Sequence, residues 1–297
     1  MHVTDPYTPD ETLTLPRMPR RVMSVSGESL EDVAFLSGAA LAQLHAVVSN
    51  PAIPHSLLRD RLALAAATAC VDFAGRLETA ADLRDAVHLL RAGDQPGPAG
   101  ALYLQWRRAV ARKVSAKHLA AVLPDQLAPH AAFWLKPGQG TPVAQAALVL
   151  EAILKDAPRA ETEALIMADA VLAQAMGWNH LVPLLAAGLP ARALRLSGDD
   201  LRLACHKAIT AKAQDAVTMA LDLARRAGRL QAISPKLRAK GADAAIALFL
   251  SHDALSPSLA LTGLMSDRAA RRLCDRLVAL GALRELTGRA TFRLYGV

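Results

Sequence analysis

Residues 261–297 read LTGLMSDRAARRLCDRLVALGALRELTGRATFRLYGV, and this stretch decides what fold we expect at the C-terminal end of the chain. Apolar residues recur at three- and four-residue intervals from Arg268 to Leu280, which is the spacing of one face of a helix. Ser266 stands where a serine side chain caps the first turn of such a helix. Gly281 stands where a glycine ends it. The stretch therefore begins with a capped amphipathic helix.

The spacing of apolar residues changes after this helix. Ala282–Leu286 and Thr291–Tyr295 have the length and composition of short strands, and the turn-forming segment Thr287–Ala290 separates them. Upstream, Ala244–His252 has the pattern of a helix. Ser256 followed by a proline predicts a second, shorter helix that ends near Gly263, because serine caps helices and proline fits their first position. We therefore expect three helices and then a hairpin.

This order is that of a winged helix-turn-helix, in which the third helix enters the major groove of DNA and the hairpin reaches the neighbouring backbone or minor groove. Arginine side chains on such a helix can bind guanine edges or phosphates. The same kind of module also mediates protein contacts, and Asp267, Asp275 and Glu285 weaken its positive field. The candidate DNA-contacting residues are Ser266, Arg268, Arg271, Arg272, Arg276, Arg289 and Arg293.

The C-terminal stretch resembles the winged-helix ends of many bacterial regulators, in which a Ser-x-Arg-x-x-x-Arg helix precedes a glycine and an arginine-bearing wing. Two further segments extend the likeness: DLRDAVHLLRAGDQPGPAGALYLQWR at residues 82–107 and MADAVLAQAMGWNHLVPLLAAG at residues 167–188. With them, the chain resembles the bacterial domain-of-unknown-function family 1403 over nearly its whole length. That resemblance implies no reaction.

The rest of the chain favours helices. Hydrophobic residues make up 53% of it and aromatic residues only 4%, and Ala and Leu, which supply most of the apolar side chains, favour helices over strands. Helical periodicity runs from residue 28 to residue 240 with proline and glycine breaks. The fold class we expect is mainly α, with an irregular multi-helix bundle in front of the winged helix-turn-helix. The expected division is 1–27 as an extended N-terminal arm, 28–240 as a helical domain and 241–297 as the winged domain.

The positive charge is concentrated in one part of the chain. Residues 201–240 contain nine Lys and Arg against two Asp and Glu, a net charge of +7. Residues 241–297 carry +2, and residues 1–200 carry −2. A near-neutral body joined to a basic C-terminal third is typical of a protein whose last third meets a polyanion. A solvated helix surface would have the same composition.

Several function classes lack their sequence signals. No apolar run reaches the length of a membrane span, and no export signal is visible, so we expect a cytoplasmic protein without membrane contact. Cys70, Cys205 and Cys274 lie far apart within apolar patterns, which predicts buried thiols. The chain contains no GxxxxGK[ST] loop, no HExxH pair and no GxSxG elbow. We therefore expect no cofactor, no metal and no catalytic residues.

One loop in the helical part could line a pocket. The segment from Arg91 to Gly100 is rich in glycine and proline, and it could hold a small ligand or a partner. It could equally be a rigid turn between helices. The candidate pocket residues are Arg91, Asp94, Trp106 and Arg107.

We expect a DNA-binding protein, a transcription regulator, that reads duplex DNA with residues 241–297. The helical domain would form a homodimer or sense a small-molecule effector. Two alternatives stay open. One is an enzyme with a pocket near Arg91 and Asp94, and the other is a plasmid or chromosome replication or partition factor.

Overall fold

A computed structural model describes residues 29–237 and 240–297 of the chain. The arm expected at residues 1–27 lies outside the described residues. Helices account for 67% of the structure, and the single sheet has two antiparallel strands, which confirms the mainly α fold class. The α-helices are α2 (Leu30–Val48), α3 (His55–Phe73), α4 (Ala80–His88), α5 (Gly97–Ala111), α6 (Ala116–Ala120), α7 (Ala131–Trp134), α8 (Pro142–Asp156), α9 (Glu161–Ala175), α10 (Leu184–Gly188), α11 (Gly198–Ile233), α12 (Ala242–Phe249), α13 (Pro257–Ala260) and α14 (Asp267–Ala279).

Capping side chains fix where several of these helices begin. Ser29 caps α2 by accepting a hydrogen bond from the backbone N–H of Asp32 at 3.1 Å. Thr79 and Asp82 form a reciprocal capping box at the start of α4. Thr141 caps α8, where Pro142 occupies the first helical position. These side chains satisfy backbone N–H groups that have no partner inside the helix.

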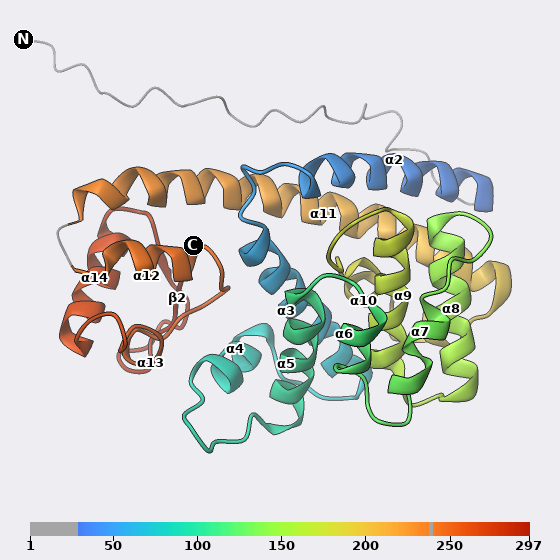
Figure 1. Cartoon of the computed structure of the whole chain (residues 1–297), viewed down its shortest axis with the longest axis horizontal. Coiled ribbons are helices and arrows are strands. Elements are labelled where there is room, and N and C mark those ends of the chain that lie inside the picture. The colour runs from blue at the N-terminus through green and yellow to red at the C-terminus, as the bar shows by residue number, and fades with distance from the viewer. Residues whose placement is uncertain (1–28, 238–239) are drawn as a thin grey trace, which may run out of the picture.

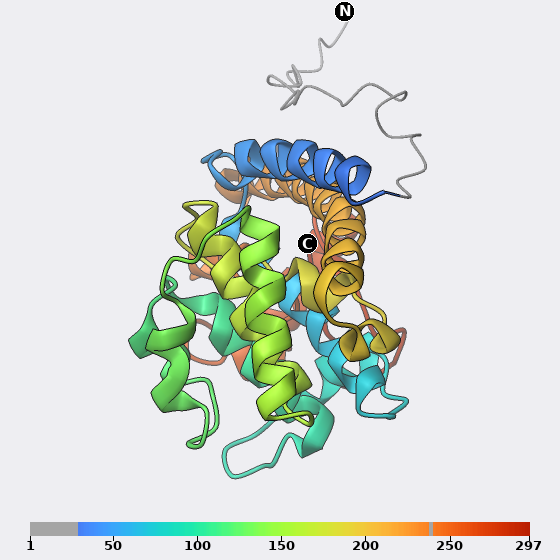
Figure 2. The same cartoon turned by 90° about the vertical axis from the view of Figure 1, so that its right-hand side faces the viewer.

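The 36-residue helix α11 is the longest element and lies along one side of the molecule (Figure 1). No proline interrupts residues 198–233, and Pro235 follows the end of the helix. Helix α2 packs along α11, and the two helices lie side by side in both views (Figures 1 and 2). Ser37 of α2 and His206 of α11 join them through a buried hydrogen bond of 2.6 Å.

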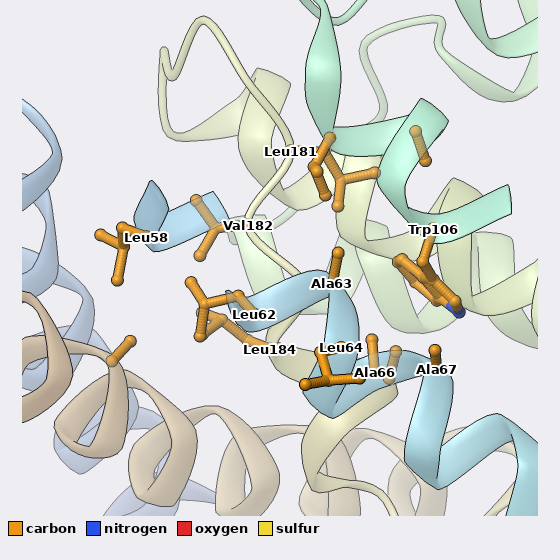
Figure 3. Packing of buried hydrophobic residues seen from close by; sticks show 14 of the residues in the cluster. Leu58, Leu62, Ala63, Leu64, Ala66, Ala67, Trp106, Leu181, Val182 and Leu184 are labelled. Carbon is orange, nitrogen blue, oxygen red and sulfur yellow. The ribbon is translucent and has the colours of Figure 1, made fainter. Parts of the chain in front are cut away.

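Helix α3 runs through the centre of the helical body, residues 29–237 (Figure 1). Its small residues Ala63, Ala66 and Ala67 let α5 and the residues around α10 approach closely, so that Trp106 and Leu184 reach the same core (Figure 3). Alanine-rich packing of this kind explains how a chain with few aromatic residues fills its interior.

Asp169 is fully buried in α9 and stabilises the start of α10. Its carboxylate accepts hydrogen bonds from the backbone N–H groups of Leu184, Leu185 and Ala186 at 3.1, 2.9 and 3.1 Å. Burial raises the pKa of Asp169 to about 7, although the three backbone donors act in the opposite direction. A short helix without a serine or threonine cap is therefore capped by a side chain from another helix.

The three cysteines are buried thiols, as the sequence pattern predicted. Burial raises the pKa of Cys70 to about 11 and those of Cys205 and Cys274 to about 12. None of the helices in residues 29–237 and 240–297 combines the length and the apolar composition that crossing a bilayer requires.

Candidate nucleic-acid interface

The C-terminal module, residues 241–297, contains α12, α13 and α14 and the strands β1 (Arg284–Glu285) and β2 (Tyr295–Gly296). Glu285 pairs with Tyr295 in the antiparallel register. Tyr295 also forms a bridge to Leu255, with two backbone hydrogen bonds of 2.9 Å. Leu255 lies between α12 and α13. The residues that follow the third helix therefore return to pair with the segment between the first two.

The hairpin has shorter strands and a longer loop than the alternation of its residues predicted. The carboxylate of Glu285 accepts hydrogen bonds from the backbone N–H groups of Thr287 and Gly288, both at 2.8 Å. These bonds curl the chain away from strand geometry. Phe292 has a φ of 53°, a conformation that residues with side chains rarely adopt and that turns the returning arm.

Helix α14 presents a buried apolar face and an exposed basic face. Ser266 caps it by accepting a hydrogen bond from the N–H of Ala269 at 3.4 Å. Ala270, Leu273, Cys274 and Leu277 are buried. The exposed face carries Arg268, Arg271, Arg272, Asp275 and Arg276.

The arginines of α14 point to solvent and not into the protein. Arg271 pairs with Asp267 one turn away at 2.7 Å, and its side chain is still 65% exposed. An exposed ion pair such as Arg271–Asp267 is weak. Within the described residues, Arg268, Arg272 and Arg276 form no ion pair. The guanidinium groups of this face are therefore available to an anionic partner.

The two arginines of the hairpin are engaged within the chain. Arg289 holds both carboxylate oxygens of Asp85 in α4, at 2.7 and 2.8 Å. Arg293 donates to the backbone oxygen of Arg289 at 2.8 Å and lies 3.9 Å from Asp275. Arg289 therefore has to leave Asp85 before it can contact a ligand.

A groove of about 520 Å³ separates α14 from the hairpin and is closed on one side by the helical body. Arg271 and Asp275 line it from α14, and Arg293 and Tyr295 line it from the hairpin. Arg91, in the loop between α4 and α5, completes it. Three guanidinium groups thus face one groove against a single carboxylate. This arrangement suits a phosphate-bearing ligand.

The expected pocket around the loop after α4 is divided among three places. Arg91 joins the groove beside α14, while the carboxylate of Asp94 accepts a hydrogen bond from the backbone N–H of Arg91 at 2.8 Å. Trp106 lies in the core and donates to the sulfur of Cys70. Arg107 pairs with Asp60 at 2.6 Å. The structure therefore does not bring these four side chains together in one cavity.

A buried ion-pair network attaches the C-terminal module to the helical body. Asp253, which is fully buried, pairs with Arg61 of α3 and Arg84 of α4, both at 2.5 Å. The backbone N–H of Asp253 donates to Asp60 at 2.8 Å, and Arg61 also donates to the backbone oxygen of Val297 at 2.9 Å. The hydrophobic core continues across the same junction. The network fixes the orientation of the module on the body.

One sign of this network is visible in the sequence. Arg59, Asp60 and Arg61 interrupt an otherwise apolar helix, and such a charged triplet marks either an exposed turn or a buried polar site. Its partner Asp253 is 192 residues further along than Arg61, so no local pattern connects them.

Several basic residues of α11 form ion pairs with acidic residues one turn away. Four of the nine Lys and Arg between residues 201 and 240 pair with acidic residues of the same helix, namely Arg202, Lys212, Arg225 and Arg226. The net charge of +7 already subtracts Asp215 and Asp222, and Asp199 adds one further counter-charge, so these pairs leave most of the net charge of the segment in place.

A family model described as a protein of unknown function, DUF1403, matches residues 6–297. The chain belongs to the DUF1403 family. The match covers both the helical body and the C-terminal module. No curated protein matches this DUF1403 chain. Within the described part of the chain, no group of three or more His, Cys, Asp or Glu side chains is placed to hold a metal ion.

Proposed function

We propose that the chain is a DNA-binding regulatory protein whose C-terminal module is a winged helix-turn-helix. The order of elements supports this proposal. A helix, a bridging residue, two helices and a hairpin follow one another, and Leu255 pairs with the returning strand at Tyr295. In this proposal α14 is the recognition helix and residues 286–294 are the wing.

The observation that carries the proposal is the basic face of α14. Arg268, Arg272 and Arg276 form no ion pair within the described residues, and the buried leucines of the same helix fix the direction of this face. Charge-assisted hydrogen bonds from arginine to phosphate or to guanine are strong and often bidentate. A capped helix with three unpaired arginines on its exposed face is therefore suited to duplex DNA.

The groove beside α14 extends this face. Arg91 and Arg293 flank Arg271, so a DNA backbone that follows the groove would meet guanidinium groups from the body, the helix and the wing. Phosphate contacts of this kind position a protein on DNA, while contacts to base edges from the recognition helix supply specificity. We assign Arg91 to the phosphate-contacting set.

The experiment is a fluorescence-anisotropy titration of a labelled 30-base-pair duplex, selected by genome-wide pull-down with the full chain. Replacing Arg271 and Arg272 by alanine removes two DNA contacts. We expect weaker binding and a plot of log K against log salt that is flatter by about two units. The double variant Arg192→Ala, Arg195→Ala, on the 3₁₀ helix before α11, removes the same charge from the body.

Two results would contradict the proposal. One is an affinity and a salt slope that do not change in the α14 variant. The other is an equal loss in both double variants, which would show that only the net charge matters. The genomic positions of the selected duplexes separate a transcription regulator from a replication or partition factor, because promoters and origins or partition sites differ in location.

A further inference from the structure

A second cavity, of about 420 Å³, lies where the helical body meets the C-terminal module. Ser56 and Arg59 line it from the first turns of α3, and Arg107 and Arg108 line it from the last turns of α5. Ser251 and His252, which follow α12, close it from the module. Its volume lies within the range of small-molecule sites.

The charges in this cavity are not balanced. Three guanidinium groups face a single carboxylate, that of Asp60. Both oxygens of Asp60 are already engaged, one by Arg107 at 2.6 Å and the other by the backbone N–H of Asp253 at 2.8 Å. Within residues 29–237 and 240–297, neither Arg59 nor Arg108 forms an ion pair. The cavity therefore holds an excess of two positive charges.

Arg59 is partly removed from water. Arg59 is half-buried and donates to the hydroxyl of Ser56 at 3.3 Å. Burial lowers the pKa of Arg59. A partly desolvated cation without a counter-charge is costly, and an anion that pairs with it recovers that cost.

The start of α3 adds to the attraction. The residue before this 19-residue helix is Pro54, and no side chain caps the first turn. An uncapped helix start carries partial positive charge and backbone N–H groups without helical partners. Two serine hydroxyls and the ring of His252 supply hydrogen-bonding groups around the same space.

We propose that this cavity binds a small phosphate monoester, with Arg59 and Arg108 as the residues that hold its phosphate group. A dianionic phosphate matches the excess of two positive charges, and the planar guanidinium groups suit its oxygens. The rest of the volume accommodates the group that carries the phosphate.

The position of the cavity gives this ligand a role. A phosphate at Arg107 competes with Asp60 for the guanidinium group, and Asp60 also holds the backbone of Asp253, the residue that fastens the module. This part of the inference rests on the proposed function, since it makes the phosphate monoester the effector that changes how α14 is presented to DNA. The binding itself does not depend on DNA.

The test is isothermal titration calorimetry on the full chain at constant ionic strength, with inorganic phosphate, glucose 6-phosphate and succinate as probes. We expect saturable binding of both phosphate compounds, and about a tenfold loss of affinity in each of the variants Arg59→Gln and Arg108→Gln. Because neither arginine has a carboxylate partner in the described residues, both variants should keep the wild-type melting temperature. Arg112→Gln, at the end of α5 and outside the cavity lining, is the matched control and should bind as the wild type does.

Several outcomes would overturn the site. The first is that neither inorganic phosphate nor glucose 6-phosphate binds saturably. The second is that succinate binds more tightly than glucose 6-phosphate. The third is that Arg59→Gln and Arg112→Gln lose the same amount of affinity for the phosphate compounds. The variant Arg271→Ala, Arg272→Ala separates the two proposals. It should bind glucose 6-phosphate normally while losing DNA, so that either the phosphate site or the DNA surface can fail alone.

Discussion

Arg289, in the hairpin loop of the C-terminal module, donates hydrogen bonds to both carboxylate oxygens of Asp85, a residue of α4 in the helical body. The two residues are 204 positions apart in the chain. Their side chains are 42% and 32% exposed, so water competes for the contact. The hairpin loop is therefore held against the body by an ion pair that a stronger anion could replace.

Replacing Asp85 by asparagine should increase the affinity for DNA by about two- to fivefold, because an exposed ion pair is weak and its loss frees Arg289 for a phosphate. Anisotropy titrations at two salt concentrations measure this change. Asp125→Asn removes the same charge from the loop after α6 and should have a smaller effect. Unchanged or weaker binding by Asp85→Asn would show that the hairpin arginine takes no part in binding.

Replacing Asp253 by asparagine should lower the free energy of unfolding by about 3–5 kcal/mol, because it leaves Arg61 and Arg84 with partly buried charges and no carboxylate. Urea unfolding measures the loss. Asp215→Asn breaks an exposed pair with Lys212 and should cost less than about 1 kcal/mol. Equal losses in the two variants would mean that the buried network contributes no more than a surface pair.

The Asp253 network also predicts sensitivity to acid. Burial alone would raise the pKa of Asp253, but Arg84 and Arg61 lower it below its ordinary value. A carboxylate whose pKa is lowered by folding stabilises the protein above the pKa of the unfolded chain, and this contribution is lost as the pH falls through the folded-state pKa. Below about pH 4, wild-type stability should therefore fall more steeply than that of Asp253→Asn. Parallel curves would contradict this.

Replacing Tyr103 by phenylalanine should raise the free energy of unfolding by about 1 kcal/mol. The hydroxyl of Tyr103 is buried and has no hydrogen-bond partner among the described residues, and an unsatisfied buried hydroxyl is destabilising. Thermal and urea unfolding measure the gain. Tyr295→Phe is the comparison, since it removes a hydroxyl that donates to Asp275 at 3.3 Å and should bring no gain. A loss in Tyr103→Phe would reveal a partner for its hydroxyl.

Asp169 should make stability depend on pH in the direction opposite to that expected for Asp253. Burial raises the pKa of Asp169 to about 7, so between about pH 4 and pH 7 the folded state binds the proton that the unfolded chain has released. Over this range stability falls as the pH rises, by up to about 1.4 kcal/mol per unit, and it levels off above pH 7. His88 and His180, whose pKa values are lowered to about 4, titrate in the same window. The contribution of these histidines cancels when the curve of unfolding free energy against pH for Asp169→Asn is subtracted from that for the wild type. A flat difference curve would contradict the raised pKa.

Local signals in the sequence predicted most of the helices. The Ser266 cap and the positions of prolines and glycines act within a few residues, so the pattern contains them. The exposed arginines of α14 followed from the same periodicity, because the spacing of its leucines fixes the opposite face. These features needed no knowledge of tertiary contacts.

Contacts between distant segments were beyond the pattern. Arg289, which we expect to contact DNA, pairs with Asp85 within the chain, and the sequence carries no sign of this pairing. Arg107 likewise pairs with Asp60 and so lies apart from Arg91, although only a short loop and α5 connect Arg91 to Arg107. Which charge meets which partner is set by the packing of helices, and periodicity does not encode that.

The unbroken helix α11 has a mechanical consequence. At 1.5 Å per residue its 36 residues measure about 54 Å, and they reach from the helices of the body to the start of the C-terminal module (Figure 1). A rod of that length tilted by about 5° at one end moves its other end by about 5 Å, more than the rise of one base pair. If the module binds DNA as proposed, small changes in packing near α8 and α10 can thus shift the end of α11 next to the module by more than the spacing of two neighbouring base pairs along the duplex.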